Sequence, residues 1–364
     1  MKKNFIIVLF TLLLISSALA ASDLDETLQA LSEDASRGYI NPMVSAFGSD
    51  MNSGWFHKAP APLKSKWDFE VGIVAMGSLL GDDKTFDVTG QFRFNRDQAE
   101  RLTEGVDADY REAVINAIMA RDYTLQVSGP TVIGEAYDDM GTADETDDLN
   151  DIRVFFPGDN IQIGDDEFNI PSQTVHIPFG GLLSDLPALP LAAPQLTIGT
   201  VYGTTASFRY LPDMETIPEI GKVGYMGYGI QHNPAVWFNA KLPVDVALAF
   251  FTQTLQVGTI MEASATTYGI NIAKTYGAKL VYVTPYLGLA AESSQMKFKY
   301  DYVTGSTTPD VPETLNIDFA VDGKNTAKLT AGLSFRLAIL NFNFDYSFAK
   351  YPSATAGMML NFSW

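Results

Sequence analysis

Strict alternation of large apolar and small polar residues in the last third of the chain limits its possible folds more than any other feature. Within residues 340–348 every second position is apolar, and the positions between them carry Asn341, Asn343, Asp345 and Ser347. Successive side chains of a β-strand point to opposite faces, so this segment predicts a strand with one apolar and one polar face. Residues 328–337 and 354–364 follow the same pattern.

Two fold classes fit such strands. In a soluble β-sandwich the apolar face packs on a second sheet. In a membrane β-barrel the apolar face contacts lipid and the polar face lines the lumen. Alternation alone does not distinguish the two, so a soluble secreted sandwich that serves as a binding module stays open as an alternative.

Three further features favour the barrel. Residues 1–20 resemble a signal peptide, with Lys2 and Lys3 before an apolar stretch and Ala18 and Ala20 at the expected cleavage site. Aromatic residues crowd the apolar positions of the strands, as in the interfacial girdles of membrane barrels. The final strand ends on Trp364, which resembles the signal that outer-membrane assembly machinery recognises. We therefore expect an all-β, transmembrane, antiparallel up-and-down barrel in the bacterial outer membrane, with outer-membrane lipid around it.

The strand count expected from the pattern is twelve. Nine strands are expected between residues 194 and 364, and three more near 66–79, 84–95 and 122–133. An even number suits a single-chain bacterial barrel. Fourteen strands are possible if 152–180 contains a hairpin, so the expected barrel domain is 66–364.

The segment before the first expected strand predicts an N-terminal helix and a plug over residues 21–65. Asp23 and Glu26 form a capping-box pattern, and an apolar helical face follows as far as residue 35. The next residues are rich in glycine, proline and aromatic side chains, which we expect to pack inside the lumen. The candidate ligand-binding residues are the plug residues Phe47, Trp55, Phe56 and His57, together with Arg209 on the polar face of a strand.

Other segments are not expected to be strands. Residues 135–167 carry twelve carboxylates against a single Arg153, which indicates a solvated acidic loop or, less favoured, a divalent-cation site. Helical periodicity lies within 97–121. The apolar stretch 178–194 contains prolines that argue against a central strand, so it is expected to cover the barrel rim.

The sequence offers little for catalysis. Its three histidines are far apart, and no nucleophile elbow, zinc motif or nucleotide-binding loop occurs. We therefore expect neither an enzyme nor a cofactor or metal. The net charge of −19 argues against nucleic-acid binding, which needs a basic face.

The strings GPTVIG (129–134), APQLTIG (193–199), GTTASFRYLP (203–212) and GYGIQHN (227–233) carry a resemblance to a known group. With them the chain resembles an uncharacterised family of predicted bacterial outer-membrane proteins, distantly similar to FadL-type fatty-acid channels. That resemblance implies a plugged barrel that passes hydrophobic molecules. Asn41 and Pro42 match the plug motif of the FadL group only weakly.

Our first functional hypothesis is an outer-membrane barrel that passes small, hydrophobic molecules through a plugged lumen. The alternative is a structural or surface-interaction barrel without transport, in which the acidic segment 135–167 is the working part.

Overall fold

The computed structural model describes residues 22–138, 150–164, 166–177, 180–217, 221–238, 242–259, 261–303 and 314–363. The expected signal peptide and Trp364 lie outside these ranges. The chain divides into two compact units. The barrel unit comprises Asn41–Gly81, Leu186–Tyr300 and Asn316–Trp364, and the insert unit comprises Met1–Ile40, Asp82–Asp185 and Asp301–Leu315.

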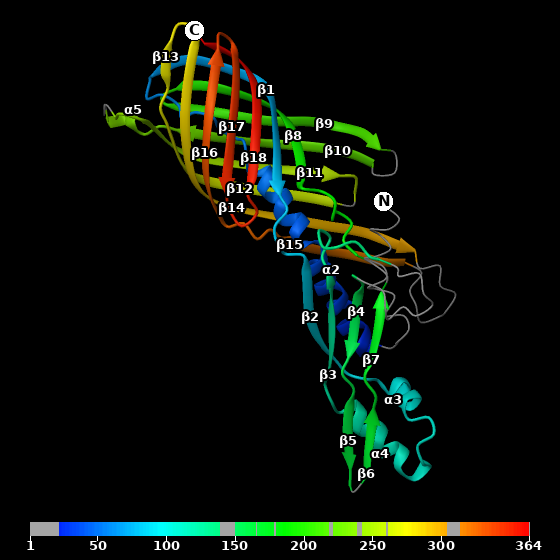
Figure 1. Ribbon diagram of the computed structural model, residues 1–364. Helices are drawn as coiled ribbons and strands as arrows, with labels where there is room; N and C mark the ends of the chain where they lie inside the picture. The colour runs from blue at the N-terminus through cyan, green and yellow to red at the C-terminus, as the bar shows by residue number, and fades with distance from the viewer. Residues whose placement is uncertain are drawn as a thin grey trace. The chain divides into compact units, whose positions relative to one another are not determined.

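Ten antiparallel strands of the described chain close into a barrel (Figure 1). In the order in which they pair, they are β1 (Ser65–Leu79), β8 (Ala188–Val201), β9 (Thr204–Ile217), β10 (Gly221–His232), β11 (Asp245–Val257), β12 (Met261–Ala273), β14 (Val281–Val303), β16 (Ala327–Leu337), β17 (Leu340–Phe348) and β18 (Ser353–Ser363). The first and last strands of the ring, β1 and β18, pair along eleven residues. β12 pairs with β14 along thirteen, so the ring has no open edge there. The short strands β13 (Tyr276–Ala278) and β15 (Thr314–Asp322) pair with β14 beside the ring.

The barrel turns the polar face of its strands inward. On β17, Asn341, Asn343 and Ser347 are buried, whereas the rings of Phe344 and Phe348 are 59% and 55% exposed. A sandwich would bury these rings between two sheets. The expected antiparallel barrel is therefore confirmed, and the sandwich is excluded.

The expected number of twelve strands is wrong for this ring, which has ten. The two segments that differ are 84–95 and 122–133, which form β2 (Thr85–Phe92) and β3 (Tyr123–Pro130) of a separate four-stranded sheet with β4 (Ile152–Phe156) and β7 (Gln173–Ile177). Apolar residues on β3 alternate as they do in the barrel, but Tyr123, Leu125 and Val127 are buried. Periodicity reports an apolar face and does not say whether lipid or protein covers it.

The insert unit has its own core. Phe92, Phe94, Tyr123 and Phe156 pack with ring centroids 4.8–6.1 Å apart. The helical segment expected within 97–121 is two helices, α3 (Arg96–Leu102) and α4 (Ala108–Met119). Asn95 caps α3 by accepting a hydrogen bond from the backbone N–H of Gln98.

The acidic segment 135–167 is not simply a loop. Its described part contains β4, the strand β5 (Asp159–Ile163) and the start of β6 (Asp166–Ile170), which pairs with β5 as a hairpin. A hairpin within 152–180 therefore exists, but it belongs to the insert unit and adds no strand to the barrel. Residues 139–149 and 165, which hold six of the twelve carboxylates, lie outside the described ranges.

The first described helix, α2 (Ser22–Met51), is longer than expected. It continues through Pro42, although proline removes a backbone donor and usually ends a helix. Contacts within the barrel unit compensate, since Asn41 Nδ2 donates to the carbonyl of Asp322 over 3.0 Å and Ser49 Oγ to that of Tyr351 over 2.8 Å. No helix among the described residues is long and apolar enough to cross a membrane.

The proline-rich stretch before residue 194 enters strand β8 at Ala188, contrary to the expectation that it forms no central strand and covers the barrel rim. Pro190 pairs with Gly77 and Pro194 with Ile73 on β1. Pairing between β8 and β9 begins only at Gln195. The prolines therefore occupy a part of β8 with one neighbour, where a missing N–H costs no ladder hydrogen bond.

Candidate functional site

One segment of the barrel unit contacts the inward-facing side chains of many strands. This inner segment, residues 48–60, comprises the last turn of α2 and the chain that leads to β1, and most of its residues are buried. Side chains from six strands bind it through hydrogen bonds or ion pairs. They are Glu70, Ser78, Gln195, Arg209, Gln253, Lys328 and Ser353.

Arg209 and Trp55 form the centre of this contact. The guanidinium carbon of Arg209 lies 4.0 Å from the centroid of the Trp55 ring, and the ring stacks on Phe251 with a centroid distance of 5.0 Å. Arg209 is fully buried, and its Nη2 donates to the carbonyl of Ser53 over 2.9 Å. Its Nε donates to Gln195 Oε1 over 3.0 Å. These acceptors are neutral, so a buried charge is held by the inner segment, the wall and an aromatic face.

Two glycines of the wall make room for the aromatic side chains of the inner segment. A Cβ added to Gly227 would lie 2.9 Å from the Trp55 ring, and one added to Gly288 would lie 2.5 Å from the Phe56 ring. Phe56 also packs edge-on against Tyr286, with a centroid distance of 5.6 Å. Real Cβ contacts are rarely this short, so the wall is shaped to these two rings.

A charged cluster holds the last part of the inner segment to β1. His57 Nε2 lies 3.1 Å from Glu70 Oε2, and Lys58 Nζ lies 2.8 Å from Glu70 Oε1 and also contacts Asp68. Asn361 on β18 donates to both carboxylates. Desolvation disfavours the charged amine, but Glu70 and Asp68 outweigh this, so the pKa of Lys58 lies above its ordinary value.

Two further charged groups lie at the helical end of the segment, Asp50 on the segment itself and Lys328 on β16. Ser78 Oγ donates to Asp50 Oδ1 over 2.7 Å, and burial raises the pKa of Asp50 to about 7. Lys328 donates to the carbonyl of Asn52, and its Nζ also lies 3.0 Å from Glu292 Oε2.

Little empty space remains around these contacts. Two cavities next to Trp55 and Phe56 measure about 10 and 20 Å³. A cavity of roughly 10–15 Å³ holds one water molecule, whereas a small-molecule site usually has about 300 Å³ or more. Neither of these two cavities, both lined by described residues, can therefore hold a cargo.

The structure brings some of the predicted site residues together. Trp55 and Arg209 are in contact, and Phe56 and His57 follow Trp55 but face Tyr286 and Glu70, respectively. Phe47 lies half-buried on α2, before the inner segment begins. No observation tests whether any of the five binds a ligand, so that role stays a prediction.

Five further residues of this site are not among the predicted site residues, namely Lys58, Glu70, Asp68, Gln195 and Asn361. All but Lys58 lie on polar strand positions, where Glu70, Gln195 and Asn361 are buried and Asp68 is partly buried. Their position on the polar face of a strand was the only sequence feature that could have identified them. Which of them meet the inner segment depends on the course of that segment, which the strand pattern does not encode.

Closed antiparallel strands, a polar interior and exposed apolar side chains define a β-barrel with the inverse polarity of a soluble globular protein. The chain belongs to a family described as "Family of unknown function (DUF6588)", whose model matches residues 1–362. Membership of an uncharacterised family is thus confirmed, and similarity to FadL-type channels stays a prediction.

Comparison with solved structures gives distant matches. The chain is similar to a bacterial polysaccharide outer membrane secretin, with 6% identity, a TM-score of 0.22 and coverage of 82% of this chain and 99% of that one. It is similar to a BenF-like porin from Pseudomonas fluorescens Pf-5, with 9% identity, a TM-score of 0.18 and coverage of 84% and 100%. It is also similar to the transport unit of the autotransporter AIDA-I from Escherichia coli, with 8% identity, a TM-score of 0.21 and coverage of 88% and 98%. No curated protein matches the chain.

Proposed function

We propose that this protein is a bacterial outer-membrane channel whose lumen is closed at rest by the inner segment, which acts as a plug. The observation that carries the proposal is the contact between this segment and side chains of six strands, made mostly through polar groups. Water can replace such partners when the segment moves, whereas a dry apolar core would resist this.

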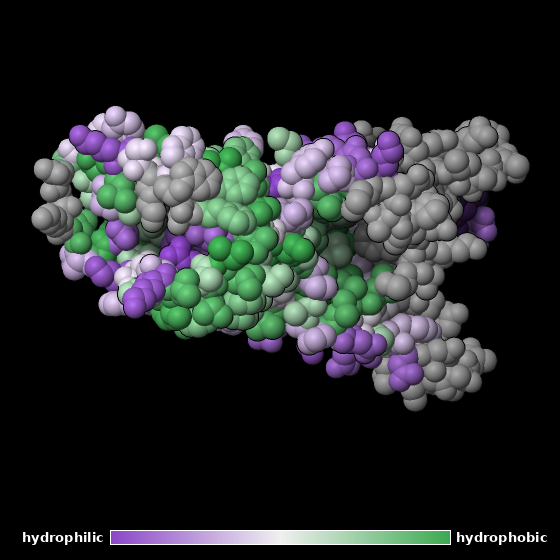
Figure 2. Space-filling model, turned by 90° about the horizontal axis from the view of Figure 1, so that it is seen from above, coloured by the Kyte–Doolittle hydropathy of each residue, from purple (hydrophilic) through white to green (hydrophobic). Residues whose placement is uncertain are grey.

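Placement in a membrane is supported by the outer face of the barrel. Its exposed side chains include large apolar residues on many strands, such as Tyr268, Leu289, Leu333 and Phe344. Figure 2 shows hydrophobic residues gathered over the barrel on the face seen from above. Strands β16, β17 and β18 have 11, 9 and 11 residues, close to the roughly 9–11 that span a bilayer.

Aromatic residues at one rim support the same placement. Tyr202 follows β8, and Trp237 lies on α5 (Ala235–Phe238), which connects β10 and β11. Their rings stack with a centroid distance of 6.0 Å, and both are at least half exposed. Phe238 is 77% exposed. Trp and Tyr favour the boundary between hydrocarbon and headgroups, so this rim fits an interface. Insertion through the outer-membrane assembly machinery is part of the proposal.

Transport would require the inner segment to leave its place. A barrel of about eight strands is filled by its own side chains, so ten strands leave room for one extra chain segment or a narrow pore. The exposed wall would present asparagine, serine, threonine and glutamine side chains, which suit a small polar solute better than a hydrophobic one. The hydrophobic cargo and its contacts with Phe47, Trp55, Phe56, His57 and Arg209 remain a proposal that these observations do not strengthen.

A disulfide lock tests the channel. The hydroxyls of Ser53 and Ser353 lie 2.7 Å apart, and the chain contains no cysteine. Ser53→Cys combined with Ser353→Cys would tie the plug to β18 when oxidised. In the matched control, Thr330→Cys with Ser347→Cys, the original hydroxyls lie 2.8 Å apart on β16 and β17, so the disulfide would join two strands of the barrel and leave the plug untied. In planar bilayers we expect oxidation to abolish the conductance of the first variant, reductant to restore it, and the control to conduct throughout. Equal conductance of the two oxidised variants would reject plug movement.

The second candidate is a structural barrel that carries the insert unit and transports nothing. The small size of the two cavities beside Trp55 and Phe56 favours it, because a permanently closed barrel needs no larger space next to these rings. Wild-type protein that enters outer membranes but never conducts in planar bilayers would support this candidate over the channel.

A further inference from the structure

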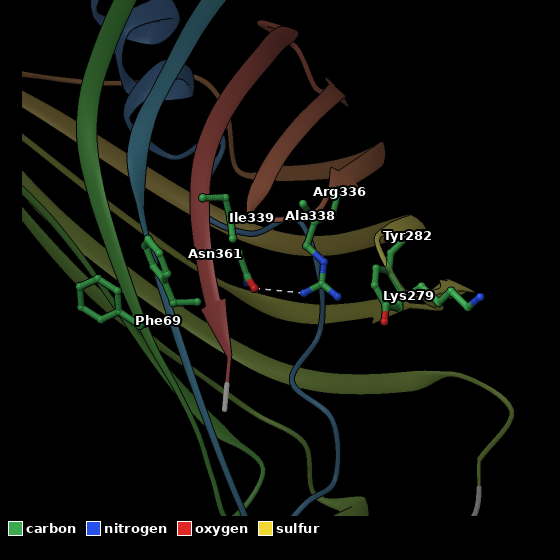
Figure 3. A pocket seen from close by; sticks show the side chains of 8 residues that line it. Phe69, Lys279, Tyr282, Arg336, Ala338, Ile339 and Asn361 are labelled. Atoms are coloured by element: carbon green, nitrogen blue, oxygen red, sulfur yellow. Dashed lines mark hydrogen bonds between the residues drawn. The ribbon is translucent and has the colours of Figure 1, made fainter.

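A hollow of about 630 Å³ opens at the barrel rim where β18 ends (Figure 3). It is much larger than the two cavities beside Trp55 and Phe56 and lies within the usual range for small-molecule sites, roughly 300–1,000 Å³. Polar side chains of Lys279, Tyr282, Arg336 and Asn361 line one part of it, and Phe69 and Phe362 line another.

Arg336 is held in place within this hollow by neutral partners. Its guanidinium carbon lies 4.1 Å from the centroid of the Tyr282 ring, and its Nη1 donates to Asn361 Oδ1 over 3.0 Å. Figure 3 shows Arg336 and Asn361 pointing toward one another from β16 and β18. Nε of Arg336 is buried and has no hydrogen-bond acceptor among the described residues. A fixed guanidinium with free donors is suited to an oxyanion, which it can bind through two N–H groups.

The charge of the lining favours an anion. Lys279 is exposed and lines the hollow together with Arg336, and no carboxylate is among the described residues that line it. The nearest acids through the hydrogen-bond network are Asp68 and Glu70, which Asn361 contacts. Both already pair with Lys58. Two cations of the lining are therefore left for a ligand.

The apolar part of the lining indicates an amphiphile instead of a free anion. Residues 361 and 362 point to opposite faces of β18, so the hollow joins the polar inner face of the wall to its apolar outer face. Ile339 lines the hollow and is 50% exposed. Leu280, whose carbonyl accepts from the N–H of Ala338, is also exposed. An acyl chain can lie on these residues while its headgroup reaches Arg336.

We propose that this rim hollow binds the phosphate headgroup of an anionic phospholipid, with Arg336 and Lys279 contacting the phosphate and the lipid tail lying on Phe362 and Ile339. The proposal rests on the membrane location proposed above. It would place one defined lipid at the end of the barrel where the chain finishes β18.

The test uses full-length protein in a non-ionic detergent and native mass spectrometry. Dioleoyl phosphatidylglycerol is titrated against dioleoyl phosphatidylcholine, which has the same chains and no net charge. We expect tighter retention of phosphatidylglycerol, weakened about tenfold by Arg336→Gln and about fivefold by Lys279→Gln. The matched control is Lys297→Gln, because Lys297 is exposed on the same strand as Tyr282, fifteen residues further along and thus roughly 50 Å away. We expect its affinity to equal that of wild type.

Equal retention of the two lipids by wild type, or equal loss in all three variants, would overturn the proposal. Displacement of phosphatidylglycerol by millimolar inorganic phosphate would also overturn it, in favour of a free-anion site. Lys279→Gln changes an exposed side chain, so it keeps the test valid if Arg336→Gln does not fold. Binding is measured in detergent, so protein that prefers phosphatidylglycerol but fails to fractionate with membranes would refute the membrane location alone. Membrane-bound protein without the preference would refute the lipid site alone.

Discussion

The guanidinium of Arg209 lies between the wall of the barrel and the Trp55 ring, 4.0 Å from the ring centroid. Register explains how the pair forms. Arg209 on β9 pairs with Gln195 on β8 and with Gly227 on β10. Gln195 supplies an acceptor, and the missing side chain of Gly227 leaves the space that Trp55 fills. Three neighbouring strands, β8, β9 and β10, thus form the packing site of Trp55.

Removing Arg209 should destabilise the packing of Trp55. We expect Arg209→Ala to lower the free energy of unfolding by about 2–5 kcal/mol, because it opens a cavity under Trp55 and leaves the carbonyl of Ser53 without its buried donor. Urea unfolding in detergent, followed by tryptophan fluorescence, measures this. The control is Arg93→Ala, which removes an exposed pair with Asp122 and should cost less than about 1 kcal/mol. Equal losses of unfolding free energy in the two variants would show that the contact between Arg209 and Trp55 adds no stability.

A side chain at position 227 should destabilise the protein, because it would overlap with neighbouring side chains. An added Cβ would lie 2.9 Å from both the Trp55 ring and the Gln253 side chain. We expect Gly227→Ala to cost about 1–3 kcal/mol in the same unfolding assay. Gly77→Ala on β1 is the matched control, since a Cβ there meets no atom within 4 Å. Combining Gly227→Ala with Trp55→Phe should recover part of the loss. No recovery would place the strain elsewhere.

The sequence was sufficient to predict the barrel but not its boundaries. Alternation on β17 identified the faces correctly, because burial of Asn343 and exposure of Phe344 follow from strand geometry. The same alternation on β3 led to the wrong strand count, since there protein and not lipid covers the apolar face. Closure of the ring depends on which strands pair, and no local pattern specifies that.

Some residues of the candidate site could be predicted from the sequence, but most of the contacts between them could not. Trp55 and Arg209 were selected on separate grounds, and the structure brings them into contact. The contact of His57 with Glu70 could not be inferred, because it depends on the course of a thirteen-residue segment without periodicity. Continuation of α2 through Pro42 was missed for a similar reason, since long-range contacts outweigh local helix preference.

Stability should depend on pH through Asp50. Burial raises its pKa from 3.8 to about 7, while Ser78, Lys328 and Tyr225 face it from β1, β16 and β10. A carboxyl group whose pKa is higher in the folded state stabilises the fold fully below pH 3.8, and this contribution is lost as pH rises through 7. The loss is about 4 kcal/mol at most.

The measurement is the unfolding free energy between pH 4 and pH 8. We expect Asp50→Asn to flatten the decline seen in wild type, because the amide mimics the protonated acid. Asp87→Asn, which alters an exposed carboxylate on β2, should leave the decline unchanged. A wild-type profile that rises over this range would have the wrong sign for a buried acid.

The outward rings of β17 should be needed for insertion into the membrane. Phe344 is 59% exposed in the middle of this strand, so Phe344→Lys would place a charge in hydrocarbon at a cost of about 2–4 kcal/mol. We expect a reduced share of this variant in the outer-membrane fraction and loss of its heat-shifted band on detergent gels. Phe155→Lys is the matched control, because Phe155 is an exposed ring on β4 of the insert unit, where we expect water to meet it. That variant should fractionate as wild type does. Normal insertion of Phe344→Lys would mean that lipid does not surround β17, and the membrane location would then have to be abandoned.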